Sequence, residues 1–417
     1  MRKFRLAVLA PMTGTSSGMG IGFYDSVTFI VGRKSPELIA NGLEIELLLR
    51  DYKSDPLVAL NTAVECAQFN DVIALLGPCD SSCAYEILQN IQNVAPDIPL
   101  LTPLATASHL TTHGAKNLFR FTTPDYQRAQ RLVQYLCTTY PRVSLYLWTL
   151  ADHQWGYSQG LKRDVIKELL TMHRPYKEED FSTTALPNEL PENNEPVICC
   201  SPSADIVRVA RFLRCNGVRS QVFSFGSNTN LLVPELKGAV SVADLDRDDT
   251  DVKVTELLSG FQTTYRSDSD PSLATMNCIS ILTSLLIRRI QDVHDAEISA
   301  VRTLILDELR SKPQEGVFRN YSFEPNGEMI GHEQICTLIV RKRRFRYFFD
   351  HVTDNKHEQI LVPAHRSISN FTKVALVTLA LGTVSSLFAS TIWSTGGVMW
   401  KAWGKRIADI IAKLLPQ

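Results

Sequence analysis

The stretch that decides the fold reads Val72-Ile73-Ala74-Leu75-Leu76-Gly77-Pro78-Cys79-Asp80-Ser81-Ser82. Its first five residues are apolar and form a run too short for an ordinary helix, which predicts a buried strand. Gly77 and Pro78 favour a tight turn, and an aspartate followed by two serines is typical of a helix N-terminus. The stretch therefore predicts a strand, a turn and a helix in succession, the repeating unit of α/β proteins.

The same alternation extends on both sides of this stretch, from the N-terminus to about residue 242. Short apolar runs are separated by longer segments with helical spacing of apolar residues, which predicts a mostly parallel sheet. The expected strands are residues 4–10, 43–50, 72–76, 100–102, 143–148, 197–200 and 221–225. Farther along, the pattern predicts helices at about 251–265, 272–293 and 297–311, and strands at 318–323 and 334–348.

The composition excludes several classes of function. Of the 417 residues, 44% are apolar and 21% are charged, as in folded soluble proteins. A formal net charge of -1 gives no basic surface for nucleic acid. The nine cysteines are scattered without a zinc-like spacing, so we expect reduced core thiols and no metal or cofactor. Because no motif pairs a nucleophile with a base, we expect a protein without catalytic activity.

Hydroxyl side chains follow the ends of two expected strands. Ser81 and Ser82 come after strand 72–76 at the start of a helix, where backbone N–H groups and the helix dipole attract anions. The next strand, 100–102, runs into Pro103-Leu104-Ala105-Thr106. Because open α/β sheets bind ligands at the carboxyl ends of their strands, these residues predict a site for an anion such as a carboxylate. The alternative is that Ser and Asp here only cap helices.

Seven short motifs occur in order over about residues 4–350. They are Ala10-Pro11-Met12-Thr13-Gly14, Asp51 with Asp55-Pro56, Gly77-Pro78-Cys79-Asp80-Ser81, Pro103-Leu104-Ala105-Thr106, Phe119-Arg120 followed by Asp125 and Gln127, Asp152 with Trp155-Gly156, and Phe323-Glu324-Pro325-Asn326-Gly327. With these motifs at compatible spacing, the chain resembles the type 1 periplasmic binding proteins, in particular the leucine/isoleucine/valine-binding branch.

The resemblance implies two doubly wound α/β lobes, joined by three crossovers, that close over a small ligand. The first lobe would comprise residues 1–122 and 247–318, and the second lobe residues 123–246 and 319–350. Family members hold an amino acid by its carboxylate through a first-lobe serine and threonine, and an aromatic residue of the second lobe covers it. The expected ligand-binding residues are Ser81, Ser82, Ala105, Thr106, Trp155, Ser201 and Asn228.

One position departs from the family pattern. The family often places an acid after the strand that corresponds to residues 221–225, where it pairs with the amino group of the ligand. This chain has Gly226-Ser227-Asn228 there. An asparagine can form hydrogen bonds but cannot offset the charge of a buried ammonium group, which is costly to leave unpaired. The sequence therefore disfavours an ordinary α-amino acid and predicts a small polar or anionic ligand that is amino-acid-like.

The C-terminal tail has a different character from the rest of the chain. Residues 351–370 are polar and are expected to form a linker. No ionisable residue occurs between Lys373 and Lys401, and this run is long enough to cross a bilayer. We therefore expect a membrane helix at 371–398, rich in small residues that favour self-association, and an amphipathic helix at 399–417. A membrane and a second copy of the chain are thus the expected partners besides the ligand.

The expected function combines these features. The first strand begins close to Met1 and leaves no room for a secretory signal, so the body is expected in the cytoplasm. Our first hypothesis is a non-catalytic ligand sensor, anchored to a membrane by its tail and signalling or acting through it. The alternatives are a solute-binding component of an ABC-type amino-acid transporter and a ligand-free interaction scaffold.

Overall fold

The computed structural model describes residues 1–112, 116–151, 156–192, 195–226, 231–244, 252–265, 270–330, 335–343, 346–352 and 357–358. Residues Met1–Ala364 form one compact unit. The predicted membrane helix (371–398) and amphipathic tail (399–417) lie outside the described residues, as does most of the predicted linker. In the part of the chain that is described, no helix is both long enough and apolar enough to cross a membrane.

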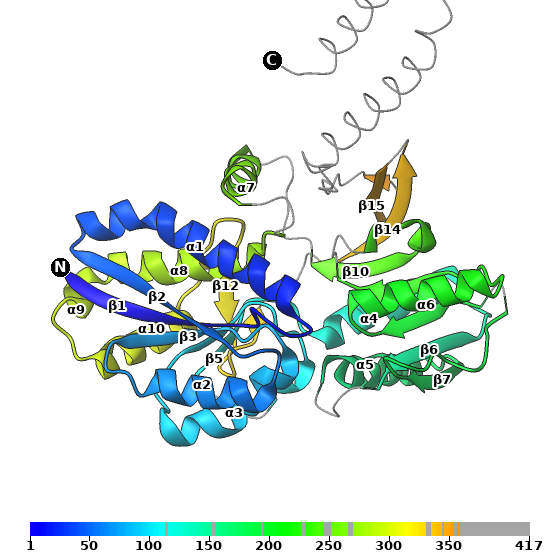
Figure 1. Cartoon of the computed structure of the whole chain (residues 1–417), viewed down its shortest axis with the longest axis horizontal. Coiled ribbons are helices and arrows are strands. Elements are labelled where there is room, and N and C mark those ends of the chain that lie inside the picture. Colours follow the sequence, from blue (N-terminus) through cyan, green and yellow to red (C-terminus); the bar gives the residue numbers. More distant parts are fainter. Residues whose placement is uncertain are drawn as a thin grey trace, which may run out of the picture. The chain divides into compact units, whose positions relative to one another are not determined.

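The first sheet is parallel and has the strand order β2-β1-β3-β4-β5. Its strands are β1 (Arg2–Ala10), β2 (Leu43–Asp51), β3 (Val72–Leu76), β4 (Leu100–Thr102) and β5 (Leu118–Arg120). The helices that pack with it are α1 (Ser17–Ala40), α2 (Pro56–Ala67), α3 (Ser81–Val94), α7 (Val252–Thr264), α8 (Leu273–Arg288), α9 (Ile290–Val293) and α10 (Ile298–Ser311). Figure 1 shows α1 and α8 on one side of this sheet and α2 and α3 on the other.

The alternation of side chains along β1 explains why both faces of the sheet are covered. Phe4, Leu6 and Val8 are fully buried in an apolar cluster that includes residues of α1, α8 and α10. Ala7 and Leu9 belong to a second cluster, with residues of α2 and α3. A central strand that is buried on both faces is typical of a parallel sheet with crossover helices.

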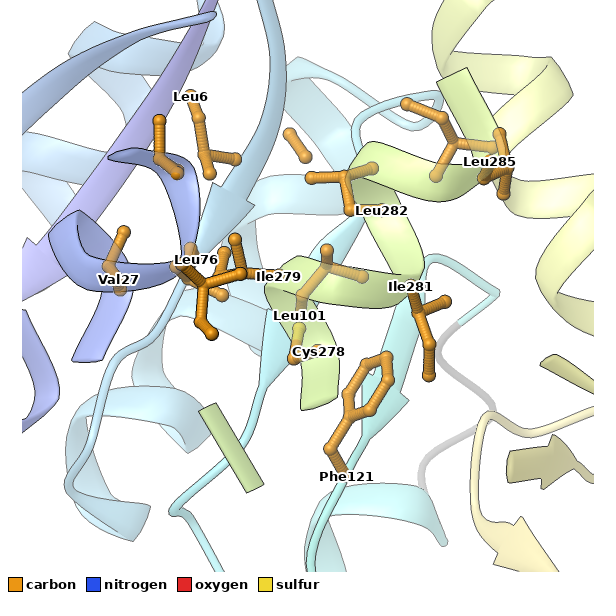
Figure 2. Packing of buried hydrophobic residues seen from close by; sticks show 14 of the residues in the cluster. Leu6, Val27, Leu76, Leu101, Phe121, Cys278, Ile279, Ile281, Leu282 and Leu285 are labelled. Carbon is orange, nitrogen blue, oxygen red and sulfur yellow. The ribbon is translucent and has the colours of Figure 1, made fainter. Parts of the chain in front are cut away.

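Helix α8 anchors the later part of the chain to this sheet. It is buried along almost its whole length, and Figure 2 shows Cys278, Ile279 and Leu282 of this helix beside Leu76 and Leu101 of the sheet. A helix that is buried on nearly all sides must have neighbouring elements around it, so α8 belongs to the core of this lobe. The chain therefore returns to the first sheet after it has built most of the second.

The second sheet has the strand order β16-β15-β14-β10-β9-β8-β6-β7. Its parallel strands are β6 (Leu145–Leu150), β7 (Tyr176–Phe181), β8 (Val197–Cys200), β9 (Val222–Phe225) and β10 (Val240–Asp244). The antiparallel strands β14 (Ile335–Arg343), β15 (Arg346–Val352) and β16 (His357–Glu358) extend it, so strand structure reaches into the predicted linker 351–370. The helices of this part are α4 (Asp125–Thr139), α5 (Tyr157–Thr171) and α6 (Ser203–Cys215).

Strand β8 divides the core of the second sheet in the same way as β1 divides the first. Val197 and Cys199 lie in a cluster with residues of α6, whereas Ile198 and Cys200 lie in a cluster with residues of α4 and α5. The two adjacent cysteines thus face opposite layers. All cysteines whose side chains the structure describes are free thiols.

A small third sheet changes one expected lobe boundary. It consists of β11 (Gln314–Glu315), β12 (Asn320–Phe323) and β13 (Met329–Ile330). The resemblance places residues 319–350 in the second lobe, but Tyr321, Phe323 and Met329 are buried in the first apolar cluster. The reason is aromatic packing, since the ring of Phe323 lies 5.2 Å from that of Phe119 and 5.0 Å from that of Phe121. Residues 320–330 therefore belong to the first lobe.

The chain passes between the two sheets three times. It leaves the first sheet between β5 and β6, returns between β10 and α7, and enters the second sheet again between β13 and β14. The α/β class with parallel sheets is thus as expected, while the other lobe boundaries stay predictions.

Candidate functional site

The candidate site begins where β3 and β4 end side by side. The two strands are paired in register, Leu75 with Leu100 and Leu76 with Leu101, so their carboxyl ends share one edge of the sheet. The turn after β3 requires glycine at position 77. Its φ is 99°, and a Cβ atom there would lie 2.3 Å from the carbonyl oxygen of Leu9. This turn places the first residue of α3 at the edge.

Two hydrogen bonds join the loops that follow β3 and β4. The Ala107 N–H donates to Ser81 Oγ at 3.2 Å, and the Thr102 hydroxyl donates to the Pro78 carbonyl at 3.3 Å. Ser81 is buried, and within the described residues its hydroxyl proton has no acceptor. The backbone N–H groups in the first turn of a helix also lack partners inside the helix. Hydrogen-bond donors therefore gather around Ser81.

Ser82 and Ala105 have smaller roles in this geometry. The Ser82 side chain is half-buried, and its hydrogen bond lowers the pKa of the neighbouring Cys83 thiol, although burial raises that pKa overall. Ala105 is buried, and its N–H donates to Thr102 Oγ1 at 3.3 Å. The Ala105 N–H thus stabilises the loop after β4, while Ser82 stands beside Ser81 at the same helix end.

Thr106 is bonded differently from Ser81. Its hydroxyl donates to Asp125 Oδ2 at 3.1 Å, and its carbonyl oxygen accepts the Asp125 N–H at 2.9 Å. The Arg120 guanidinium also donates to the Thr106 carbonyl, at 3.1 Å. The hydroxyl proton of Thr106, which was expected to bind a ligand, is therefore hydrogen-bonded to Asp125, the first residue of α4.

Asp125 is a residue whose role the sequence did not reveal. It is fully buried, and Oδ1 has no hydrogen-bond partner among the described residues, with Nη1 of Arg128 3.9 Å away. Burial raises the pKa of Asp125 to about 7. The charges of Arg128 and Arg120 and the hydrogen bond from Thr106 act in the opposite direction, while Asp164 adds to the increase. This carboxyl group can therefore exchange a proton near neutral pH.

A buried ion pair stabilises the loop after β4. Arg120 at the end of β5 is fully buried, and its Nε donates to Glu328 Oε1 at 3.0 Å while Nη2 contacts Oε2 of the same carboxylate. Its Nη1 donates to the Ala107 carbonyl at 2.7 Å. Such a two-point contact fixes both orientation and distance. The sequence did not indicate this pair because its members lie far apart in the chain.

Two aspartates accept hydrogen bonds from the loop that follows β1. Asp80, directly before Ser81, accepts the Ser16 hydroxyl at 2.6 Å and the Tyr52 hydroxyl at 2.7 Å. Asp51 accepts the Thr13 hydroxyl at 2.7 Å. Burial alone would raise the pKa of Asp51, but hydrogen bonds from the Thr13 side chain and from backbone N–H groups lower it. These carboxylates tie the loop after β1 to the site.

The second sheet contributes fewer described residues. Ser201 follows β8 and is buried, and its hydroxyl has no hydrogen-bond partner in the part of the chain that the structure describes. Trp155 and Asn228 lie outside the described residues. The Ser108 hydroxyl, after β4, donates to Asp164 Oδ2 of α5 at 2.5 Å, which connects the two lobes beside the site. Within the described ranges, no group of His, Cys, Asp and Glu could hold a metal ion.

One family model and several solved structures match the chain. A family model described as periplasmic binding protein matches residues 3–330. No curated protein sequence matches the chain. An ABC transporter substrate-binding protein from Desulfitobacterium hafniense, in complex with leucine, shares 15% identity at a TM-score of 0.66, over 84% of this chain and 100% of its own.

Two further solved structures resemble the chain to a similar degree. The branched-chain amino acid transporter substrate-binding protein LivJ from Streptococcus pneumoniae, in complex with isoleucine, is 14% identical at a TM-score of 0.68, with 84% of this chain and 99% of that one covered. A solute-binding protein of an ABC transporter from Rhodopseudomonas palustris, in complex with 3,4-dihydroxybenzoic acid, is 13% identical at a TM-score of 0.68, covering 84% and 96%. At such identities the likeness concerns the fold.

Proposed function

This chain belongs to the periplasmic binding protein family, whose members bind ligands and are not enzymes, and from this premise we propose that it binds a small carboxylic acid beside Ser81 and Thr106. The observation that carries the proposal is the hydrogen bond from the Ala107 N–H to Ser81 Oγ. It joins the loops after β3 and β4 and leaves the Ser81 hydroxyl proton available for an acceptor from the ligand.

A carboxylate suits this arrangement for a physical reason. It carries two acceptor oxygens, and the first turn of α3 offers backbone donors at the positive end of the helix dipole. Hydrogen bonds to a charged acceptor are about twice as strong as those between neutral groups. The proposal places one carboxylate oxygen at Ser81 and the other toward Thr106.

The absence of an acid directly after β9 narrows the class of ligand. The similar structures hold two kinds of ligand, amino acids and a dihydroxybenzoic acid, and only an amino acid has an ammonium group that needs an anionic partner. In this sequence Gly226-Ser227-Asn228 follows β9 and supplies an amide instead. Carboxylic acids without an ammonium group therefore come first. Trp155, Ser201 and Asn228 remain the proposed second-lobe contacts.

Isothermal titration calorimetry on the full chain tests this proposal. The probes are 3,4-dihydroxybenzoate, L-leucine and L-isoleucine, and we expect the aromatic acid to bind more tightly. At a concentration of one hundred times the dissociation constant it should stabilise the fold by about 2.7 kcal/mol. Ser81→Ala should weaken binding about tenfold, the value of one hydrogen bond to a charged group.

The control variant is Ser299→Ala, which removes an exposed hydroxyl in α10 and should leave the affinity unchanged. Tighter binding of L-leucine than of the aromatic acid would overturn the proposed ligand class. No binding of any probe would favour the third hypothesis, a ligand-free interaction scaffold.

The role of the binding event is the second part of the proposal. We propose a sensor that its tail, residues 371–417, anchors to a membrane and that associates with a second copy through the membrane helix. The uncharged run between Lys373 and Lys401 supports this idea. A chain truncated before residue 371 should move from the membrane fraction to the soluble fraction, and equal fractionation of both chains would contradict the anchor.

A solute-binding component of an ABC transporter is the second candidate. Its support is the description of the similar structures as ABC transporter substrate-binding proteins. The two functions differ in where the body lies. Protease added to intact cells should leave a cytoplasmic sensor whole, whereas digestion of the body on intact cells would favour the transport component.

A further inference from the structure

Thr106 and Asp125 form a closed pair at the proposed site. The Thr106 hydroxyl donates to Asp125 Oδ2 at 3.1 Å, and the Asp125 N–H donates to the Thr106 carbonyl at 2.9 Å. A threonine hydroxyl has one proton. While that proton is held by Asp125, Thr106 can offer only lone pairs to a ligand, and these repel a carboxylate. Both members of the pair are buried, so water cannot easily supply the missing donor.

Rotation of the Thr106 proton toward a ligand would leave an ionised Asp125 poorly solvated. Oδ1 of Asp125 already lacks a hydrogen-bond partner among the described residues, and Oδ2 would lose the bond from Thr106. A buried carboxylate without hydrogen bonds costs several kcal/mol. Protonation of Asp125 removes this conflict, because the acid can then donate to Thr106 Oγ1 and release the Thr106 proton for the ligand.

We propose that a carboxylate binds at Thr106 only together with a proton on Asp125, so that Asp125 is a positioning residue that couples anion binding to proton uptake. This inference rests on the proposed carboxylate site. Where Asp125 is ionised before binding, one proton passes from solvent to Asp125 for each anion bound, no covalent bond of the ligand changes, and the net charge of the site stays constant.

The charged groups around Asp125 are compatible with this exchange. Arg128 of α4 and Arg120 of β5 favour the ionised form, but Arg120 is already paired with Glu328. Asp164 of α5 favours the neutral form, as does burial, and the balance brings the pKa of Asp125 to about 7. Asp164 itself has a pKa above the ordinary value, through burial.

Two further groups face Asp125 from the second lobe. Tyr157 at the start of α5 and Cys200 at the end of β8 both have pKa values that burial raises, and the negative charge of Asp125 raises them further. Both therefore stay protonated near neutral pH. Of the groups named, Asp125 is the one whose protonation by solvent can reverse the direction of the hydrogen bond with Thr106.

Titration calorimetry in buffers of different ionisation enthalpy tests the inference on the full chain, with 3,4-dihydroxybenzoate as the probe. With a pKa of about 7 for Asp125, formation of the complex should take up roughly three quarters of a proton at pH 7.5 and almost none at pH 5.5. The dissociation constant should rise about fourfold from pH 5.5 to pH 7.5. Binding without proton uptake, at constant affinity, would overturn the coupling and leave the proposed function intact.

Variants separate coupling from structure. Asp125→Asn should bind with no proton uptake and with an affinity that does not change with pH, because an amide can donate to Thr106 permanently. Thr106→Val should weaken binding and abolish uptake, while Thr106→Ser should restore both. The matched control Asp164→Asn removes the neighbouring acid and should keep the uptake. If the probe binds at no pH, the proposed function fails and this inference fails with it.

Discussion

The two edges that carry the predicted ligand residues differ in how their polar groups are held. At the first-lobe edge, Ser81, Thr106 and Asp80 all have hydrogen-bond partners within the fold, and the Arg120–Glu328 pair supports them from below. At the second-lobe edge, the buried hydroxyl of Ser201 has no partner among the described residues. These groups of the first edge are thus in place before a ligand binds, whereas the Ser201 hydroxyl of the second edge can still form a hydrogen bond with a ligand.

This comparison separates two contributions to ligand binding, that of a preformed edge and that of a buried group without a partner. A preformed edge loses little conformational freedom on binding, so most of its interaction energy appears as affinity. A buried group without a partner destabilises the protein alone and gains its bond only with a ligand. Loss of the contacts that hold the first edge together, such as Arg120–Glu328 and Tyr52–Asp80, should therefore affect mainly the stability of the fold, whereas loss of the Ser201 hydroxyl should affect mainly the ligand.

The largest effect is expected from breaking the ion pair under the first edge. Arg120→Ala leaves the Glu328 carboxylate buried without its partner, which should lower the free energy of unfolding by roughly 3–5 kcal/mol, toward the upper end of that range. Urea denaturation measures the loss. The control Lys34→Ala removes an exposed pair with Glu37 and should cost only a few tenths of a kcal/mol. A loss below about 1 kcal/mol for Arg120→Ala would show that the edge is not held by this pair.

The next effect depends on pH. Since the pKa of Asp125 is about 7 in the folded state and near its ordinary 3.8 when unfolded, the folded state retains a proton that the unfolded state has released. This contribution to stability is complete below about pH 4 and is lost as the pH rises toward 7, by up to about 4 kcal/mol. Asp125→Asn should remove this contribution to the pH dependence of the free energy of unfolding. Parallel pH profiles of wild type and variant would speak against a neutral Asp125.

A smaller loss of stability is expected when the hydrogen bonds between Tyr52, directly after β2, and the first edge are removed. Tyr52→Phe removes a hydroxyl that accepts the Cys79 N–H at 3.0 Å and donates to Asp80 at 2.7 Å. The free energy of unfolding should fall by roughly 1–3 kcal/mol, because both groups lose a bond in a buried region. Tyr126→Phe is the matched control, since that ring is exposed. Equal stability of the two variants would contradict the role of Tyr52.

The smallest effect should have the opposite sign. Ser201→Ala removes a buried hydroxyl without a described partner, so we expect the ligand-free protein to gain about 1 kcal/mol while affinity for 3,4-dihydroxybenzoate falls about tenfold. Ser220→Ala is the control: it is a buried serine whose hydroxyl donates to the Glu192 carbonyl at 2.9 Å, and its loss should destabilise the fold. If both variants lose stability alike, the two edges do not differ as described.

Strong local patterns made much of the fold predictable. The bounds of β3, β4 and β8 agree with the expected strands because each is a short apolar run between turn residues. The sequence does not predict strand β7, since Tyr176–Phe181 is an edge strand with four charged residues and no apolar pattern. Strand β5 was missed because three residues, Leu118–Arg120, are too few to show a period.

The site was predictable only where it depends on topology. Ser81 and Thr106 follow neighbouring parallel strands, so their proximity could be inferred from the order of elements alone. The role of Asp125 could not, although the motif after Phe119-Arg120 contains it, because burial and an unmatched oxygen are properties of the packed structure. The Arg120–Glu328 pair joins residues 208 positions apart, and no local pattern connects them.

The adjacent cysteines of β8 can report on the unfolding of the second lobe. Burial raises the pKa of both thiols, so a thiol reagent added to the native protein should modify the exposed Cys215 long before either of them. Because Cys199 faces α6 and Cys200 faces α4 and α5, each becomes reactive only after its own helical layer has left the sheet. Their separate labelling rates would time the detachment of the two layers, and so give the order in which this lobe unfolds.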